Sequence, residues 1–356
     1  MLVASERINV KSQFGDYDVI SVSTFPEMVQ CLSGFDFRGI LIDKAVMNSF
    51  STELSLPDAP TYALEVAEEA KQYRQLEDVY LWMANSGFDR RSPLLVIGGG
   101  TTQDIATFVT ATYHRGVPWV FIPTTLLSQS DSCIGGKCGI NLRGFKNQIG
   151  LVNPPDLIVA QSQFLRRLSI EDLVSGLGEI LKIAVTGQNQ FWEQYQALTE
   201  ASDPKNFDYQ RLIMLALNAK KYVIEIDEME NDYRRVLNYG HTIGHAIEAA
   251  SDFRISHGIG VLLGIKVISR LGERWGITPP GLASDVIGCA DHLLAHSTSP
   301  RDFSVTDAIS MLKHDKKTLN GQITFVVLAE PGHHIFVQKS LNEVLVSELA
   351  EELEKL

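Results

Sequence analysis

The sequence is poor in cysteine and lacks long apolar runs. Only Cys31, Cys133, Cys138 and Cys289 occur among 356 residues, with no C-x-x-C spacing between them. So sparse a set excludes a disulfide framework and indicates reduced thiols. No apolar run approaches the roughly 20 residues of a membrane span. The N-terminal stretch MLVASERINVKSQFGDYD is too polar for the core of a signal peptide. We therefore expect a soluble, cytoplasmic protein that does not enter a membrane.

Basic residues are also scarce. The chain has 31 Lys and Arg against 43 Asp and Glu, for a net charge of −12. This balance argues against a nucleic-acid-binding protein, which needs a basic surface for phosphates. Anionic small molecules remain compatible with it, because a few local Lys and Arg can form a pocket in an acidic protein. The hydrophobic content of 45% is enough for a sizeable core, and the length predicts two domains.

The first part of the chain alternates short apolar runs with helical patterns. The run from Leu64 to Asn85 has helical spacing and predicts a helix. Alternation of this kind predicts an α/β layer with a mostly parallel sheet. The runs that predict its buried strands are Tyr17–Val22, Gly39–Ile42, Leu94–Ile97, Trp119–Ile122 and Leu157–Ala160.

After Asn153-Pro154-Pro155 the pattern becomes mainly helical, with long amphipathic stretches at Asp208–Glu225 and Thr242–Ala250. Near the C-terminus, Ile323–Ala329 and His334–Val337 predict a hairpin. We therefore predict an α/β domain over residues 1–162 and a mainly helical domain over residues 163–356.

A glycine triplet, Gly98-Gly99-Gly100, follows one predicted strand directly and continues as Thr101-Thr102-Gln103-Asp104. Glycines at a strand-to-helix turn let the backbone approach a pyrophosphate, which the free N–H groups of the next helix bind. The triplet is not the G-x-G-x-x-G fingerprint, and a plain tight turn explains it equally well. Thr124 and Thr125 follow another predicted strand, where open α/β sheets bind ligands.

A second polar segment runs from Asp131 through Gly135-Gly136-Lys137 to Asn141, Lys146 and Asn147. Its lysines and amides suit an anionic, hydroxyl-rich ligand. A solvated loop is the alternative explanation.

The strongest pattern is a dispersed metal set. His241 and His245 are four residues apart, which places both imidazoles on one face of a helix. His257 follows, and Glu179-x-x-Lys182 precedes them. One carboxylate and two imidazoles with an open position form a common catalytic zinc site. Spacing alone does not tell which histidine is not a ligand, and hydrogen-bonded core histidines are the alternative.

Two further groups of basic residues are candidates for binding an anion. Lys220 and Arg234, with Asn238 close by, suit a carboxylate or phosphate. Asp315-Lys316-Lys317 would alone pass as a charged turn.

Taken together, these motifs resemble the 3-dehydroquinate synthase family and its relatives, the sugar phosphate cyclases. The resemblance spans roughly residues 68–330, and two pieces, LNYGHTIGHAIE and PTTLLSQSDSCIGGK, are highly specific. The other matching pieces are GGGTTQD, ATYHRG, KNQIG, GLGEILK, DEMENDYRR, the SHG at His257 and HDKK. The resemblance implies a dinucleotide-binding α/β domain followed by a helical domain.

The resemblance also implies roles for individual residues. Glu179, His241 and His257 would ligate the metal, usually zinc, with cobalt as an alternative. Arg115 would reach the substrate phosphate from a neighbouring subunit, which implies a homodimer. The catalytic set would be His245, Lys182, Lys137, Asn238 and Asp131. The substrate would further contact Lys220 and Arg234 through its carboxylate, and Lys146, Asn147, Lys316 and Lys317. NAD would contact Asp43, Glu68, Lys71, Gly99, Gly100, Thr101, Asp104, Thr124, Thr125 and Leu127.

The family reaction converts 3-deoxy-D-arabino-heptulosonate 7-phosphate to 3-dehydroquinate and phosphate. It proceeds by transient oxidation by NAD, phosphate elimination, re-reduction and intramolecular aldol closure, in the shikimate pathway to the aromatic amino acids. Lys220, Arg234 and His245 favour this carboxylated substrate over the heptulose or hexose phosphates of secondary-metabolism cyclases. A metal-dependent polyol dehydrogenase is the third alternative.

Several positions depart from the family pattern. Gln103 replaces a usual glycine, and Ala45 stands where a polar NAD contact is common. The segments around Phe145 and Pro154 also differ. These departures affect the cofactor loops and the choice of substrate, and leave the implied metal ligands unchanged.

Overall fold

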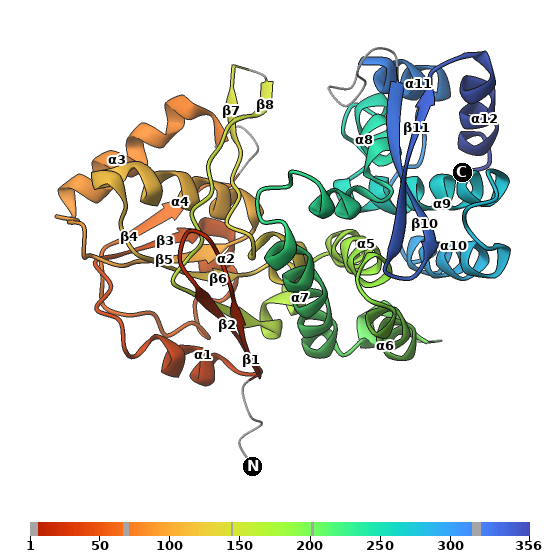
Figure 1. The fold of residues 1–356 in the computed structure, drawn as a ribbon. Coiled ribbons are helices and arrows are strands. Elements are labelled where there is room, and N and C mark those ends of the chain that lie inside the picture. The colour runs from red at the N-terminus through yellow and green to blue at the C-terminus, as the bar shows by residue number, and fades with distance from the viewer. Residues whose placement is uncertain (1–5, 67–70, 144, 201–202, 315–321) are drawn as a thin grey trace. The chain divides into compact units, whose positions relative to one another are not determined.

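The computed structural model describes residues 6–66, 71–143, 145–200, 203–314 and 322–356. These residues form two compact units (Figure 1). The first comprises residues 1–168 together with 209–228, and the second comprises residues 169–208 and 229–356. The helix at 209–226 thus packs with the first unit although it follows part of the second in sequence. The boundary at residue 162/163 stays a prediction, because compactness alone does not show which segments fold independently.

The first unit is built on a seven-stranded sheet of order β1-β2-β9-β6-β5-β3-β4. All neighbouring strands are parallel except β1 and β2. The predicted mostly parallel sheet is confirmed. The strands are β1 (Glu6–Val10), β2 (Tyr17–Val22), β3 (Gly39–Asp43), β4 (Thr61–Leu64), β5 (Leu94–Gly98), β6 (Trp119–Pro123) and β9 (Leu157–Gln161).

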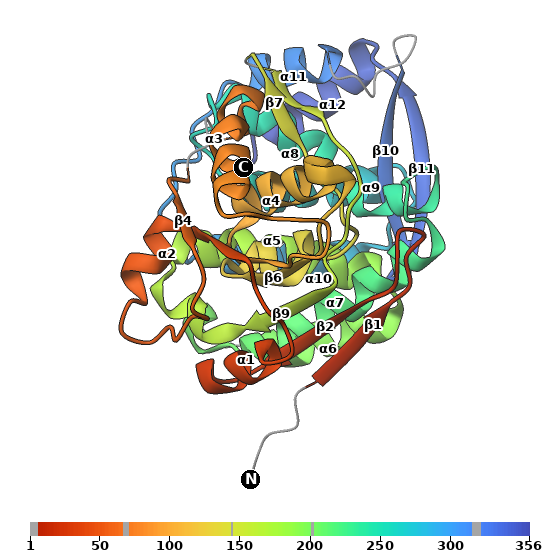
Figure 2. The same ribbon diagram turned by 90° about the vertical axis from the view of Figure 1, so that its left-hand side faces the viewer.

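Helices cover both faces of this sheet, with α1 and α4 on opposite sides (Figures 1 and 2). A separate hairpin joins β7 and β8, and the turn η4 at Ser128–Ser132 has π-helical geometry. The helices of this unit are α1 (Phe25–Leu32), α2 (Lys44–Ser49), α3 (Leu76–Asn85), α4 (Gly100–Thr112) and α7 (Tyr209–Ile226), and the hairpin strands are β7 (Ile140–Leu142) and β8 (Phe145–Ile149). The shorter turns are η2 (Tyr73–Gln75), η3 (Tyr113–Arg115) and η5 (Ser162–Arg167).

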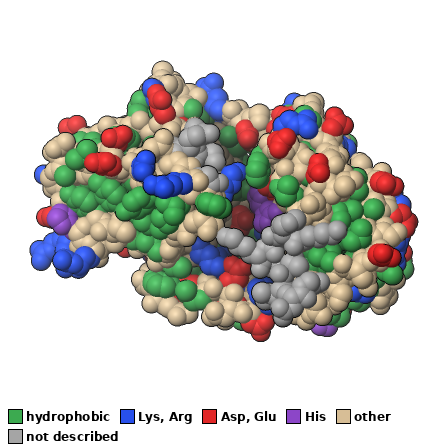
Figure 3. Space-filling view, turned by 90° about the horizontal axis from the view of Figure 1, so that it is seen from above, with side chains coloured by type: hydrophobic (Ala, Val, Ile, Leu, Met, Phe, Trp, Pro, Cys, Tyr) green, Lys and Arg blue, Asp and Glu red, His purple; other side chains and the backbone are tan. Residues whose placement is uncertain are grey.

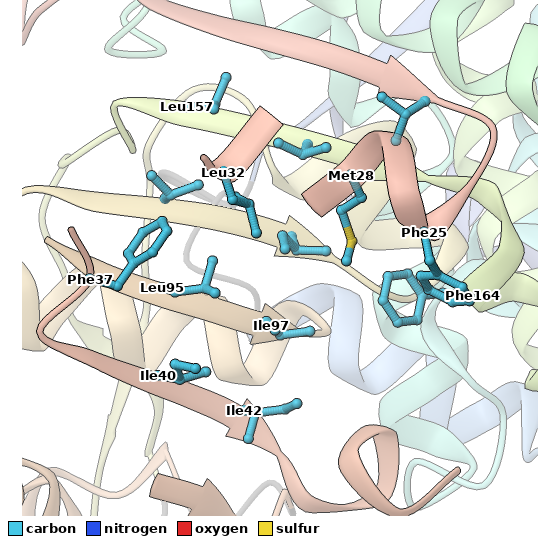
Figure 4. Packing of buried hydrophobic residues seen from close by; sticks show 14 of the residues in the cluster. Phe25, Met28, Leu32, Phe37, Ile40, Ile42, Leu95, Ile97, Leu157 and Phe164 are labelled. Carbon is cyan, nitrogen blue, oxygen red and sulfur yellow. The ribbon is translucent and has the colours of Figure 1, made fainter. Parts of the chain in front are cut away.

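The core between α1 and the sheet shows why these runs become strands. Successive strand residues point to opposite faces, so Ile40 and Ile42 face α1 while Leu41 faces the other side. Met28 and Leu32 of α1 pack onto them in the same cluster (Figure 4). Three aromatic rings, Phe25, Phe50 and Phe164, close one end of it with edge contacts whose centroids lie 5.1–5.7 Å apart.

The predicted helix over Leu64–Asn85 is confirmed in its second half, as helix α3, and its first residue is wrong. Leu64 ends strand β4, and the described helix α3 begins only at Leu76. Leu64 belongs to the strand because Thr61–Leu64 pairs with β3, and that pairing adds backbone hydrogen bonds that local helical spacing does not reveal. The two edge strands β1 and β4 were not predicted from the sequence.

The second unit is mainly helical and contains one hairpin, formed by β10 and β11 (Figure 1). The predicted hairpin and the predicted helix over Thr242–Ala250 are confirmed. The helices are α5 (Ile170–Thr186), α6 (Asn189–Thr199), α8 (His241–Ala250), α9 (His257–Arg274), α10 (Pro280–Leu294), α11 (Val305–His314) and α12 (Glu343–Leu353), the strands are β10 (Gln322–Glu330) and β11 (His333–Ser340), and the short turns are η6 (Pro204–Asn206) and η7 (Tyr233–Asn238). Among the described residues, no helix combines the length and the apolar character that crossing a membrane requires.

Candidate functional site

Glycines bring helices α5, α8 and α9 of the second unit unusually close together. A Cβ on Gly258 would lie 1.9 Å from the carbonyl oxygen of Ser175 on α5. A Cβ on Gly264 would lie 2.1 Å from the carbonyl oxygen of Gly240, the residue that precedes α8. Any larger side chain would push these backbones apart. The close packing places the polar residues near the starts of α8 and α9 beside the middle of α5.

The three predicted metal ligands converge at this crossing. Oε1 of Glu179 lies 3.4 Å from Nε2 of His241 and 3.2 Å from Nε2 of His257. Metal–ligand bonds of about 2.0–2.2 Å at tetrahedral angles place ligand atoms about 3.4 Å apart. The arrangement therefore has the dimensions of a tetrahedral zinc site.

His245 belongs to the same cluster. Ligand atoms of His241, His245 and His257 all lie within 4.8 Å of one another, and the three rings lie 5.1–5.5 Å apart between centroids. The His245 side chain is exposed, whereas Glu179 is fully buried. A ligand set of three histidines is thus an alternative to Glu179, His241 and His257. The short distances from Glu179 to two imidazoles favour the latter.

The outer nitrogens of two of these imidazoles have acceptors of their own. Nδ1 of His257 lies 3.0 Å from Oε1 of Glu248, and Nδ1 of His241 lies 3.3 Å from the carbonyl oxygen of Tyr239. An acceptor at Nδ1 favours the tautomer with its proton there and leaves the Nε2 lone pair for a metal. The residues therefore fit a divalent metal.

Burial and charge act differently on the two histidines. Burial lowers the pKa of His241 well below its ordinary value, and the positive charges of Lys182 and the neighbouring histidines lower it further. The neutral imidazole that results is the form that binds metals. Burial also lowers the pKa of His257, but Glu179 and Glu248 outweigh burial and raise it to about 10. A metal at Nε2 of His257 would therefore take the place of a proton, and its binding would release that proton. Lys182 forms a buried ion pair with Oε2 of Glu179.

Two site residues predicted from the sequence, the substrate residue Arg234 and the catalytic residue Asn238, lie in turn η7 of the same unit. Arg234 is buried, and the Nδ2 group of Asn238 donates a hydrogen bond of 3.2 Å to Glu230. Sequence reasoning missed both Glu230 and Glu248. A signal for Glu248 exists, because it follows His241 by seven residues and therefore lies on the same face of α8.

In the first unit, the predicted cofactor residues follow the carboxyl ends of adjacent strands. Asp43 ends β3, Gly98 ends β5 and Pro123 ends β6, and these strands are neighbours in the sheet. The predicted residues Thr124, Thr125 and Leu127 come next after β6. Asp43 accepts a hydrogen bond of 2.8 Å from the backbone of Ala45 and so caps α2. Ligands bind at this edge of open α/β sheets.

The glycine turn leads into helix α4, as the sequence predicts. Gly99 caps the helix, and Gly100 and Thr101 form its first turn. A Cβ on Gly99 would lie 3.0 Å from the Thr125 side chain. The free N–H groups of this turn and the positive end of the helix dipole suit a pyrophosphate.

Lys71, Asp104 and Asn147 form a network beside α4. Nζ of Lys71 lies 2.7 Å from Oδ2 of Asp104 and donates a hydrogen bond of 3.0 Å to Oδ1 of Asn147. Asp104 also accepts a hydrogen bond of 3.1 Å from the backbone of Gly139. The structure thus connects two predicted cofactor residues with a predicted substrate residue.

Lys220 and Asp131 form a largely buried ion pair. Nζ of Lys220 lies 2.5 Å from Oδ1 of Asp131 and donates a hydrogen bond of 2.5 Å to its backbone carbonyl. Lys137 lies close behind in sequence, in the segment that follows η4. Asp131 thus holds the Lys220 ammonium group in place.

The remaining predicted residues lie at the surface or outside the described residues. Lys146 and Asn147 are exposed on β8. Arg115 is exposed in a tight turn where His114 and Arg115 both have positive φ, at 50° and 65°. On the described part of the face in Figure 3, basic side chains lie singly or in small groups among acidic ones. Glu68, Lys316 and Lys317 lie outside the described residues.

Comparisons with known proteins agree with the fold and the motifs. The chain matches the 3-dehydroquinate synthase N-terminal family over residues 61–175 and the 3-dehydroquinate synthase C-terminal family over residues 176–318. It is 31% identical to the 3-dehydroquinate synthase of Streptococcus mutans, over 98% of this chain and 100% of that relative. It is 34% identical to that of Dehalococcoides mccartyi, over 81% of this chain and 80% of that relative.

The solved structures that share the fold include two cyclases with bound cofactor and metal. One is 2-deoxy-scyllo-inosose synthase with carbaglucose-6-phosphate, NAD+ and Co2+, with a TM-score of 0.84 at 22% identity, covering 98% of this chain and 100% of that one. The other is 2-epi-5-epi-valiolone synthase from Streptomyces hygroscopicus with NAD+ and Zn2+, with a TM-score of 0.81 at 24% identity, covering 97% and 98%. The two family matches together span most of the chain, and full-length relatives exceed 30% identity, so this protein belongs to the 3-dehydroquinate synthase family of cyclases.

Proposed function

We propose that this chain is a 3-dehydroquinate synthase that converts 3-deoxy-D-arabino-heptulosonate 7-phosphate to 3-dehydroquinate and phosphate. The observation that carries the proposal is the convergence of Glu179, His241 and His257, with distances of 3.2 and 3.4 Å from one carboxylate oxygen to two imidazole nitrogens. The identity of about 31% to a full-length 3-dehydroquinate synthase supports it.

Two buried cationic side chains support the proposal that the substrate carries a carboxylate. Lys220 and Arg234 are each only 6% exposed. A guanidinium group binds a carboxylate through two parallel hydrogen bonds, and an ammonium group adds a point charge. Sugar phosphates without a carboxylate would make no such use of both residues.

In this proposal Glu179, His241 and His257 hold a divalent metal, Zn2+ or Co2+, which polarises substrate oxygens when bound. NAD binds against Gly99, Gly100, Thr101 and the strand-end residues, and when bound it accepts and returns a hydride. Structures of two fold relatives with NAD+ and with Co2+ or Zn2+ support both assignments. The remaining NAD contacts would be Asp43, Glu68, Lys71, Asp104, Thr124, Thr125 and Leu127.

Polar residues of the chain would orient the substrate and move its protons. Lys182 would hold a proton on Nζ against Glu179, and the exposed imidazole of His245 would take up or release a proton. Lys137 and Asn238 would bind the phosphate and hydroxyl groups, and Asp131 would keep Lys220 oriented. Lys146, Asn147, Lys316 and Lys317 would add further substrate contacts. Holding a flexible polyanion in one reactive conformation supplies much of the rate enhancement in such reactions.

The proposal includes a homodimer in which Arg115 reaches the phosphate bound by the neighbouring subunit. The exposure of Arg115 in a sharply defined turn supports this role. We place the activity in the cytoplasm, which the four free cysteines support.

The test measures phosphate release from 3-deoxy-D-arabino-heptulosonate 7-phosphate with NAD and Zn2+, while absorbance at the NADH band is followed in parallel. We expect stoichiometric phosphate without net NADH. Release only from a heptulose or hexose phosphate would instead indicate a secondary-metabolism cyclase, and steady accumulation of NADH on a polyol would indicate a dehydrogenase.

Removal of the metal by a chelator tests the metal assignment. Chelation should abolish turnover and leave the circular dichroism spectrum unchanged, and full activity after chelation would contradict the assignment.

A further inference from the structure

Gln103 is a buried polar residue whose amide nitrogen and amide oxygen both bond to a single partner. Its side chain is almost completely buried in the first turn of α4. Its Nε2 group donates a hydrogen bond of 2.7 Å to the backbone carbonyl of Ser132, and its Oε1 accepts one of 2.7 Å from the Ser132 hydroxyl. A buried amide costs stability unless it is hydrogen-bonded. Both the nitrogen and the oxygen of this amide bond to Ser132, which indicates a specific tether.

The tether ends one residue from the buried ion pair. Ser132 directly follows Asp131, which contacts Lys220 through both its carboxylate and its backbone carbonyl, each at 2.5 Å. The backbone carbonyl contact matters because rotation of the peptide between Asp131 and Ser132 would break it. Holding Ser132 in place therefore also holds the backbone carbonyl oxygen of Asp131, which accepts a hydrogen bond from Lys220.

The geometry of turn η4 requires support from contacts such as this tether. Residues 128–132 adopt a π-helical turn, a rare conformation that persists where other contacts support it. A Cβ on Gly100 would lie 3.8 Å from the Ser132 hydroxyl, so η4 runs directly beside the glycine turn that leads into α4. Gln103 is the side chain that bonds these two neighbouring turns to each other.

We propose that Gln103 is a positioning residue that holds Ser132, and through it Asp131 and Lys220, against the first turn of α4. The consequence is that the Lys220 ammonium group keeps a set position relative to the turn proposed to bind NAD. The functional part of this inference rests on the proposed function, in which Lys220 binds the substrate. The positional part does not, and it can be measured without turnover.

The first experiment measures the reactivity of Lys220. Limited acetylation by acetic anhydride, read by mass spectrometry, compares Lys220 with its neighbour Lys221 as internal standard. We expect Gln103→Leu to raise the acetylation of Lys220 relative to Lys221 about tenfold, as the loss of two hydrogen bonds allows. The smaller change Ser132→Ala, which removes only the hydroxyl contact, should raise it less. An unchanged ratio in both variants would overturn the proposal.

The matched control is Asn153→Leu. The Asn153 amide also joins α4 to a later segment, through a hydrogen bond of 3.0 Å to the Thr110 hydroxyl, but at the other end of the helix. It should lower thermal stability to a similar degree and leave the acetylation of Lys220 unchanged. An equal increase in this control would mean that general loosening of α4, and not the tether, exposes Lys220.

The second experiment is a double-mutant cycle on the Michaelis constant for 3-deoxy-D-arabino-heptulosonate 7-phosphate. We expect Gln103→Leu to raise KM about tenfold in the wild-type background and less than about twofold in a Lys220→Ala background, because coupled residues are not additive. An equal factor in both backgrounds would overturn the coupling. If the wild-type protein does not act on this substrate, the proposed function fails, while the acetylation result still decides the role of Gln103.

Discussion

The two units position their polar side chains by different means. In the first unit, most residues proposed to bind NAD follow the ends of parallel strands, and side chains such as Gln103 and Asp104 bond one segment to the next. In the second unit, the proposed metal ligands lie on helices, and backbone contacts at glycines bring those helices together. The first arrangement depends on hydrogen bonds, whereas the second depends on the absence of side-chain volume. Substitutions should therefore affect the units differently.

The largest expected effect is that of Gly258→Ala. Its Cβ would lie 1.9 Å from the backbone carbonyl oxygen of Ser175, so α5 and α9 must separate. We expect a loss of about 3 kcal/mol in the free energy of unfolding, measured by denaturant titration, together with weaker Zn2+ binding. Gly288→Ala is the control, because nothing beyond the neighbouring backbone of its own helix lies within 4 Å of the added methyl group. Equal stability of the two variants would contradict the close packing inferred for the second unit.

Next in size is the effect of Glu248 on metal binding. Glu248→Ala removes the acceptor that lies 3.0 Å from Nδ1 of His257. Loss of such an outer partner typically weakens metal affinity about 10–100-fold, and we expect this in the dissociation constant for Zn2+ measured by competition with a chelating dye. Glu273→Ala, on the exposed side of α9, should leave the constant unchanged. A value like that of the wild type for Glu248→Ala would show that packing alone orients His257.

A smaller effect is expected at the side-chain network of the first unit. Asp104→Asn keeps an oxygen for the backbone of Gly139 but removes the charge that faces Lys71 at 2.7 Å. We expect the dissociation constant of NADH to rise about tenfold, as for the loss of a charged hydrogen bond, measured by fluorescence titration. The control Glu65→Gln removes an exposed ion-pair partner of Lys44 and should leave the dissociation constant of NADH unchanged. If Asp104→Asn binds NADH as tightly as the wild type, the network does not support the cofactor site.

The smallest effect is expected at the exposed ion pair between Arg274 and Glu351, neither of which is a proposed site residue. Arg274, and after it Lys355, lower the pKa of Glu351 to about 2. Because this pKa is lower in the folded chain than in the unfolded one, the stabilisation is present above about pH 4.5 and is lost as the pH falls toward 2. The Tm of Glu351→Gln should therefore be slightly below that of the wild type at pH 7, and the difference should shrink in acid. A difference independent of pH would exclude this charge interaction.

Much of the first unit could be predicted from sequence because its strands are buried. Runs such as Leu94–Ile97 and Trp119–Ile122 are short, apolar and β-branched, and these properties by themselves favour a central strand. Edge strands such as β1 are half exposed, and their composition does not distinguish them from loops. The apolar spacing from Leu64 onward fits a helix, whereas pairing with β3 makes Leu64 itself the end of a strand and helix α3 begins only at Leu76.

The candidate site was predicted in part, for a related reason. His241 and His245 could be grouped because the spacing of a helix is a local property. The sequence alone therefore determined the buried strands, the helical histidine pair and the motifs shared with the family. Only the tertiary structure decided that Lys220 pairs with Asp131, that Gln103 bonds to Ser132 and that Glu179 faces two imidazoles. These contacts join residues far apart in the chain, and they depend on how closely backbones approach, which no local pattern of residues encodes.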